Sequence, residues 1–230
     1  MALHGITQTG ETLSYYMRLQ EVTANNLANA NTDAFKAVRL AAHMLPGVTH
    51  PVPVESHDLR QGDLRETARP LDLALDGPGF IVVRTLQGER LMRGGSLKLD
   101  AAGRLTDQRG DLVLGTEGPL VLQGADVTFE SDGTVRVDDR RVGRLRLVTV
   151  EDPGTLAKEG GGRFLASTNL LPAPDSTQVR QGVIEQANLD PLLSMVDLIT
   201  IQRAYAANID VLRAMDSVLG TVTGEVGKVE

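Results

Sequence analysis

Hydrophobic residues between positions 190 and 222 recur in alternate steps of three and four. A repeat that averages 3.5 residues is typical of a helix that buries one narrow seam against other helices. Asp190 followed by Pro191 predicts where this helix begins, because a carboxylate caps a helix and proline is favoured at the first helical position. Gly220 and the glycines after it indicate its end. The seam comprises Leu198, Ile201, Tyr205, Asn208, Leu212, Met215, Leu219 and Val222.

Residues 5–30 carry a second helical pattern, whose heptad seam includes Ile6, Leu13, Met17 and Leu27. The Asn and Asp residues between positions 25 and 33 favour helix ends, because their side chains compete with the backbone for hydrogen bonds. We therefore expect this helix to end between residues 29 and 32, and residues 34–36 to continue as an extended segment. Since no other segment has comparable helical character, the two terminal helices are expected to pair. Their seams then cover each other within one molecule or also meet other subunits, and the polar Asn208 is typical of helices that associate in a fixed register.

The middle of the chain reads as β structure. Prolines and glycines between residues 44 and 70 forbid a long helix and predict an extended connector, with a short hairpin around Gly62. Short apolar runs separated by Gly or Asp turns in residues 71–150 predict an antiparallel sandwich or barrel-like domain. The strongest hairpin signal is Asp132-Gly133, which lies between Val127–Phe129 and Thr134–Val137. Residues 151–178 read as loop, with a strand allowed near residues 163–165, and residues 181–185 as a last strand.

The predicted fold class is therefore α+β. The N- and C-terminal helices pair in a coiled-coil-like bundle, and an antiparallel β domain is inserted between them. The expected domains are residues 1–44 together with 186–230, an extended connector over 45–70, and a β domain over 71–185.

Composition excludes several classes of function. The net charge of −7 over 230 residues lacks the basic surface of a general nucleic-acid binder, and aromatic residues make up only 3% of the chain. The absence of cysteine rules out disulfides, thiolate catalysis and cysteine metal sites. The first residues do not read as a cleavable secretory signal, and no run of 18 apolar residues predicts a membrane span.

No group of residues has the spacing that catalysis or metal binding requires. His43, His50 and His57 are seven residues apart, but the prolines between them prevent the helix that would align them. The glycine clusters at 77–79 and 160–162 lack the neighbours of a phosphate-binding loop. We therefore expect no catalytic, cofactor-binding or metal site and no cofactor, and we expect that the chain is not an enzyme. The competing hypothesis, an enzyme or carbohydrate-binding β domain, predicts convergent titratable groups in residues 71–150.

Three stretches resemble the flagellar rod and hook protein family of bacteria. Residues 24–36, A-N-N-L-A-N-A-N-T-D-A-F-K, resemble the family's N-terminal A-N-N-L-A-N-x-x-T-x-G-F-K signature. Gly77–Val83 is similar to its G-x-G-F-F-x-V strand, and residues 181–188 with 195–208 resemble its C-terminal Q-G-x-L-E-x-S-N and M-I-x-x-Q-R-A-Y-x-x-N blocks. One departure is Ala34, where the family usually has Gly. Because Gly accepts a positive φ and Ala resists it, the motif does not fix the backbone just after the first helix.

The resemblance implies a structural subunit that polymerises through its terminal helices into the axial drive shaft of the flagellar basal body. Its partners would be copies of itself and neighbouring rod or hook axial proteins, with no nucleic acid, membrane insertion or small-molecule substrate. It would be exported by the flagellar type III apparatus without a cleaved signal peptide, to a rod that spans the periplasm. Its assembly interface would combine the two helix seams with residues of the N-terminal signature, namely Asn25, Asn26, Leu27, Asn29, Thr32 and Phe35.

Two shorter stretches, Arg69–Leu75 and Val142–Leu147, resemble the proximal-rod type within this family. The alternatives are a distal-rod or hook-type axial subunit, or an adaptor without enzymatic activity that binds a single partner helix.

Overall fold

Two long helices form from the terminal patterns of the sequence. They are α1, Ala2–Ala28, and α2, Pro191–Val226. Asp190 caps α2 as predicted, since its Oδ1 accepts hydrogen bonds from the backbone N–H groups of Leu192 at 2.8 Å and Leu193 at 3.3 Å. Helix α2 continues through Gly220 and Gly224 and is described as far as Val226, directly before Gly227, the last of the three glycines that indicated its end.

The structure is a computed structural model that describes residues 2–43, 52–152, 154, 156–166 and 169–226. It divides the chain into two units, each described by itself below. The helical unit comprises Met1–Ala28, Val38–Ser56 and Asp190–Glu230. The β unit comprises Asn29–Ala37 and His57–Leu189. The domain boundaries expected from the sequence stay a prediction.

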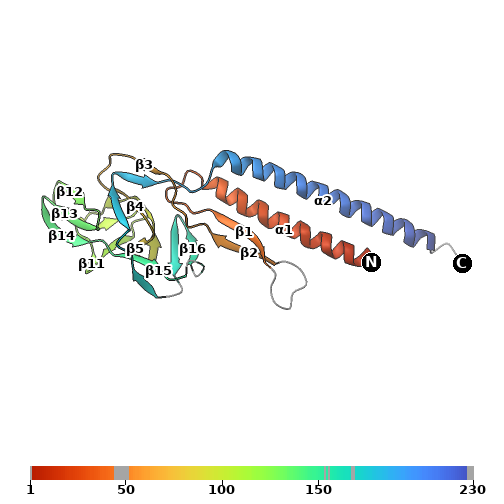
Figure 1. The fold of residues 1–230 in the computed structure, drawn as a ribbon, viewed down its shortest axis with the longest axis horizontal. Coiled ribbons are helices and arrows are strands. Elements are labelled where there is room, and N and C mark those ends of the chain that lie inside the picture. Colours follow the sequence, from red (N-terminus) through yellow and green to blue (C-terminus); the bar gives the residue numbers. More distant parts are fainter. Residues whose placement is uncertain (1, 44–51, 153, 155, 167–168, 227–230) are drawn as a thin grey trace. The chain divides into compact units, whose positions relative to one another are not determined.

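In the helical unit, α1 and α2 pack side by side and run antiparallel (Figure 1). A hairpin of β1, Val38–His43, and β2, Val52–His57, lies against α1. Only β2 of this hairpin lies in the predicted connector, and the hairpin is far from Gly62, where one was expected. A two-stranded hairpin is marginal alone, and here it is held by contacts with α1, including an ion pair between Arg18 and Glu55 at 2.5 Å.

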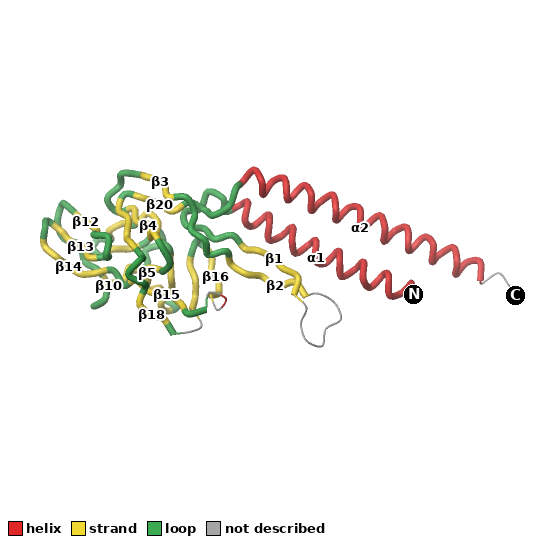
Figure 2. Tube along the Cα trace, in the orientation of Figure 1, coloured by secondary structure: helices red, strands yellow, loops and turns green. Residues whose placement is uncertain are grey.

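The β unit consists mainly of short strands joined by loops and turns (Figure 2). Its strands pair antiparallel wherever the structure describes their register. Its largest sheet contains β5 (Phe80–Thr85), β6 (Gly88–Met92), β8 (Lys98–Leu99), β9 (Leu105–Thr106), β10 (Leu112–Gly115), β11 (Gly118–Pro119), β15 (Leu147–Val150), β16 (Leu156–Gly160), β17 (Arg163–Ala166) and β18 (Leu170–Pro172). The smaller sheets contain β12 (Val127–Phe129), β13 (Thr134–Val137) and β14 (Arg140–Arg144); β19 (Gln178–Gln181), β4 (Asp72–Asp76) and β7 (Gly94–Ser96); and β20 (Val183–Glu185) with β3 (Leu64–Glu66). The α+β class with an antiparallel β part is confirmed, whereas coiled-coil geometry of the helices stays a prediction.

Strand β5 explains how the core of the β unit is built. Successive side chains of a strand point to opposite faces. Ile81 and Val83 pack in one hydrophobic cluster with Val113 and Leu145, while Phe80 and Val82 pack in another. Because both faces are buried, β5 is a continuous apolar run rather than an alternating one.

The predicted β12–β13 hairpin is confirmed, with Val127 opposite Val137 and Phe129 opposite Val135. The prediction of loop over residues 151–178 is wrong for β16, β18 and the start of β19, and the strand that was allowed near residue 163 is β17. These strands are short and flanked by glycine or proline, so the local sequence pattern resembles that of a loop. They are held by pairing with distant strands, such as Phe164 of β17 opposite Leu91 of β6.

Candidate functional site

The predicted seam of α2 faces the interior of the helical unit. Ile201 is only 8% exposed, and the other described seam residues are partly buried. The Thr9 hydroxyl of α1 lies 3.9 Å from the Met215 sulfur. Asn208 donates from Nδ2 to the carbonyl of Ala204 in its own helix at 2.8 Å. The side chain of Val222 lies outside the described residues.

The described residues of the predicted α1 seam differ in their exposure to solvent. Leu13 and Leu27 are partly buried, Met17 is 51% exposed, and the side chain of Ile6 lies outside the described residues. Heptad reasoning missed Val22, the most buried described side chain of α1. Val22 lies one helical turn before Asn26, whose side-chain amide is hydrogen-bonded to Val38 of β1. Because the sequence did not predict the hairpin of β1 and β2, it gave no reason to expect a buried residue at position 22.

A second apolar surface lies on α2, mostly on the side away from its seam and extending along one flank. Five large apolar side chains near its start are 49–69% exposed. At 100° per residue, Val196 and Ile199 lie roughly opposite Ile201 around the helix. We call these residues the outer patch of α2: Leu192, Leu193, Met195, Val196 and Ile199.

The asparagines of the two terminal motifs replace missing backbone partners. In the helical unit, Asn26 donates to the carbonyl of Val38 at 2.8 Å and accepts from its N–H at 2.9 Å. In the β unit, Asn188 accepts from the N–H of Ala37 at 2.8 Å and donates to the carbonyls of Asp58 at 2.6 Å and Arg60 at 3.0 Å. Both side chains thus fix irregular backbone near the start of β1.

Other residues of the N-terminal signature form the turn after α1. The N–H of Thr32 donates to the carbonyl of Asn29 at 2.9 Å, and their side chains are in hydrogen-bond contact at 3.3 Å. Asn25 is exposed, whereas Phe35 is 2% exposed inside the β unit.

Three charged side chains in the β unit form what we call the buried ion cluster: Lys36, Arg93 and Glu185. Lys36 and Glu185 are fully buried, and Lys36 Nζ lies 2.5 Å from Glu185 Oε1. Arg93 donates from Nε to Glu185 Oε2 at 3.1 Å and from its other nitrogens to the carbonyls of Leu75, Gly77 and Gly79. Burial lowers the pKa of Lys36, while the Glu185 carboxylate acts in the opposite direction.

Phe35 is covered by Lys158 of β16, whose Nζ lies 3.2 Å from the ring centroid and donates to the carbonyl of Lys36 at 3.0 Å. The face of an aromatic ring attracts a cation. Burial nevertheless lowers the pKa of Lys158 from 10.5 to about 8.

This pKa predicts a pH dependence of stability. Between about pH 8 and the ordinary lysine value, the unfolded chain binds more protons than the folded chain, so the free energy of unfolding rises with pH. Urea unfolding should therefore show the wild type gaining stability from about pH 8 to about pH 10 relative to Lys158→Met, which has no amine there. Parallel pH profiles for the two proteins would contradict the assignment.

Ala34, where the family usually has Gly, has a φ of 54° and is 2% exposed. The left-handed conformation strains a residue with a Cβ, and a β-branched residue most of all. We expect Ala34→Val to lower the free energy of unfolding by roughly 1–3 kcal/mol, because the larger, β-branched side chain must be forced into a buried left-handed position. Ala34→Gly should raise it by up to about 1 kcal/mol. Thermal unfolding measures both, and equal stability of the two variants would show that this φ is not retained in solution.

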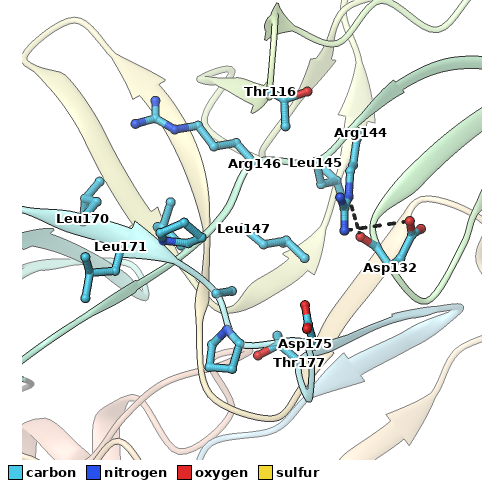
Figure 3. Close-up of a pocket in the computed structure, with 14 residues that line it drawn as sticks. Thr116, Asp132, Arg144, Leu145, Arg146, Leu147, Leu170, Leu171, Asp175 and Thr177 are labelled. Carbon is cyan, nitrogen blue, oxygen red and sulfur yellow. Dashed lines mark hydrogen bonds and ion pairs between the residues drawn. The ribbon is translucent and has the colours of Figure 1, made fainter.

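A groove of about 620 Å³ lies on the β unit along β15 and β18 (Figure 3). Both of its arginines are engaged with neighbours: Arg144 donates to the carbonyl of Asp132 at 2.9 Å, and Arg146 to the carboxylate of Glu89 at 2.8 Å. Hydrogen bonds from the backbone N–H and hydroxyl of Thr134, together with nearby arginines, lower the pKa of Asp132. A carboxylate held ionised in this way is unsuited to proton transfer near neutral pH.

Among the residues that the structure describes, no group of three or more His, Asp or Glu side chains is placed to hold a metal ion. Within the same residues, neither helix is apolar enough over a sufficient length to cross a membrane.

Two family models match the ends of the chain, where the predicted motifs lie. The flagella basal body rod protein model matches residues 13–36, and the flagellar basal body rod FlgEFG protein C-terminal model matches residues 180–224.

Whole-chain relatives carry related descriptions. The chain is 35% identical to the flagellar basal-body rod protein FlgF of Caulobacter vibrioides, over 86% of each chain. It is 32% identical to FlgF of Escherichia coli, over 94% of this chain and 96% of that one. A relative described as the flagellar basal-body rod protein FlgG, from Agrobacterium fabrum, is 26% identical over 88% of this chain and 92% of its own.

Proposed function

Since the chain belongs to the flagellar basal-body rod protein family and is most like its FlgF members, we propose that copies of the chain join one another through the outward surfaces of their helices α1 and α2. The chain is a structural subunit of the bacterial flagellar basal-body rod and not an enzyme. The resemblance to the rod family is thus confirmed, and the preference for FlgF over FlgG agrees with the order of the relatives.

The outer patch of α2 carries this proposal. An isolated amphipathic helix places its apolar residues on the side that it buries. Helix α2 buries the seam around Ile201, yet it also exposes Leu192, Val196 and Ile199 by half or more. A contiguous exposed apolar surface is typical of a protein–protein contact. Exposed Met17 offers a smaller apolar surface on α1.

The occupant that we propose for the outer patch is the helical unit of a second copy. Full burial of a Leu, Ile or Met side chain contributes roughly 1.5–3 kcal/mol. Side chains already half buried contribute less, and association has its own entropic cost. A single contact of this size is therefore weak, and stable assembly requires that each subunit makes several such contacts, as a polymer provides.

Aspartate substitutions in the outer patch test the proposal. Val196→Asp and Ile199→Asp should raise the concentration at which the full chain assembles by about tenfold or more, which corresponds to about 1.4 kcal/mol. Far-UV circular dichroism should stay unchanged, because these side chains are 53% and 50% exposed in the subunit. Sedimentation velocity across a concentration series measures the assembly.

The matched control is Leu86→Asp, because Leu86 is fully exposed in the turn between β5 and β6 of the β unit. This variant should assemble like the wild type. Normal assembly of Val196→Asp and Ile199→Asp would exclude the outer patch from the contact.

We further propose that the partners are copies of this chain and neighbouring axial proteins, and that the rod spans the periplasm after export by the type III apparatus. These points rest on the family resemblance. The residues predicted from the two seams and the N-terminal signature remain proposed interface residues. The alternative, an adaptor that binds a single partner helix, predicts a complex of fixed 1:1 stoichiometry and no larger assemblies at high concentration.

A further inference from the structure

The buried ion cluster has no part in the assembly contacts proposed above. Lys36 and Glu185 have fully buried side chains, and Arg93 is 4% exposed. A buried charge is strongly unfavourable unless an opposite charge and hydrogen bonds compensate it. The three groups therefore depend on one another for their burial.

Glu185 is the centre of this dependence. Its Oε1 accepts from Lys36 Nζ and from the N–H of Gly62 at 3.0 Å, and its Oε2 accepts from Arg93. Lys36 also donates to the carbonyl of Arg60 at 2.6 Å. Lys36 and Glu185 are separated by 149 residues in sequence, so Lys36 is buried beside its carboxylate partner only while residues 34–37 and β20 are both in place.

Backbone hydrogen bonds join the same two segments of the chain. The N–H of Ala34 donates to the carbonyl of Glu185 at 2.7 Å, and the N–H of Asn188 donates to the carbonyl of Phe35 at 3.2 Å. The N–H of Ala37 donates to Asn188 Oδ1. Residues 34–37 are thus hydrogen-bonded to residues 185–188 both before and after Lys36 in the sequence.

We propose that the buried ion cluster couples the order of residues 34–37 to that of residues 184–188, so that these two segments of the β unit become ordered together. The chain enters the β unit from α1 at Asn29, before the first segment, and leaves it for α2 at Leu189, just after the second. The cluster therefore holds together the two stretches of the β unit that lie next to the helix junctions in sequence. This role concerns folding within one subunit and is independent of the outer patch.

A double-mutant cycle on the full chain tests the coupling. The variants are Lys36→Met, Glu185→Met and the double variant, and the readout is amide hydrogen exchange of Ala34 and Ala37 under native conditions. The N–H of Leu105, which donates to the carbonyl of Leu120 in the core, is the internal reference. Arg180→Met is the matched control, because Arg180 pairs with Asp76 on the surface of the neighbouring strands and its side chain is 54% exposed.

Lys36→Met should reduce the protection of Ala34 and Ala37 by about tenfold or more while that of Leu105 changes much less, as expected for local opening. The double variant should lose less protection than the two single losses multiplied together, because Arg93 is then the one cation of the cluster without its carboxylate, whereas Glu185→Met alone leaves both Lys36 and Arg93 without it. Arg180→Met should leave all three amides unchanged. The proposal is overturned if Ala34 and Ala37 keep their protection in Lys36→Met, if all three amides lose it equally, or if the single effects multiply.

Discussion

Glu185→Gln is expected to lower the free energy of unfolding by about 3–5 kcal/mol, the cost of breaking a buried ion pair by removing one partner. The amide can still accept one hydrogen bond, but it leaves Lys36 and Arg93 as neighbouring buried cations without their carboxylate. Since small domains have a free energy of unfolding of only about 5–15 kcal/mol, this single change should remove a large part of it. Urea unfolding followed by circular dichroism measures it.

Glu89→Gln is the control for this variant. Glu89 also pairs with an arginine, Arg146, but the two side chains are 39% and 36% exposed. An exposed pair contributes at most about 1 kcal/mol, so the control should remain close to wild type. If both glutamine variants lose the same small amount, Glu185 is hydrated in solution and the buried ion cluster is not formed as described.

Truncation should have a comparably large effect. A fragment of residues 29–189 is expected to unfold cooperatively, whereas residues 45–185, the β domain and connector expected from the sequence, should not fold stably. The shorter fragment lacks Phe35 and Lys36, both buried, and Asn188, whose side chain bonds Ala37 and Arg60. Removing a buried Phe side chain alone costs about 3–5 kcal/mol.

A fragment of residues 38–189 separates the two contributions, since it keeps Asn188 but loses residues 29–37. It should resemble the fragment of residues 45–185. Equal unfolding midpoints and slopes for all three fragments would show that residues 29–37 do not belong to the folding unit of the β structure.

Local signals predicted the helices well. The Asp190 cap and Pro191 placed the start of α2, and the Asn-rich run placed the end of α1 between residues 29 and 32, shortly after its position at Ala28. Both signals act through neighbours in sequence, by capping and by competition for backbone hydrogen bonds. The seam of α2 was also readable, because helical periodicity is a property of one segment.

The surfaces on the other side of the helices were not readable in the same way. Leu192 and Val196 look like ordinary helix residues in the sequence, and only the packing of α1 against the seam leaves them exposed. Val22 was missed because it lies on the same side of α1 as Asn26, which is hydrogen-bonded to β1. The sequence around β1 and β2 did not predict a hairpin there.

The sequence by itself determined the two terminal helices, the antiparallel character of the middle and, through its motifs, the rod family. Each of these depends on short-range pattern, capping or turn chemistry. Only the tertiary structure decided that residues 163–166 pair with β6, that Ala34 adopts a positive φ, and that Lys36 is buried. A lysine in an isolated sequence is expected at the surface. It is buried here because a carboxylate 149 residues away meets it inside the β unit, and such a partner cannot be recognised from local sequence.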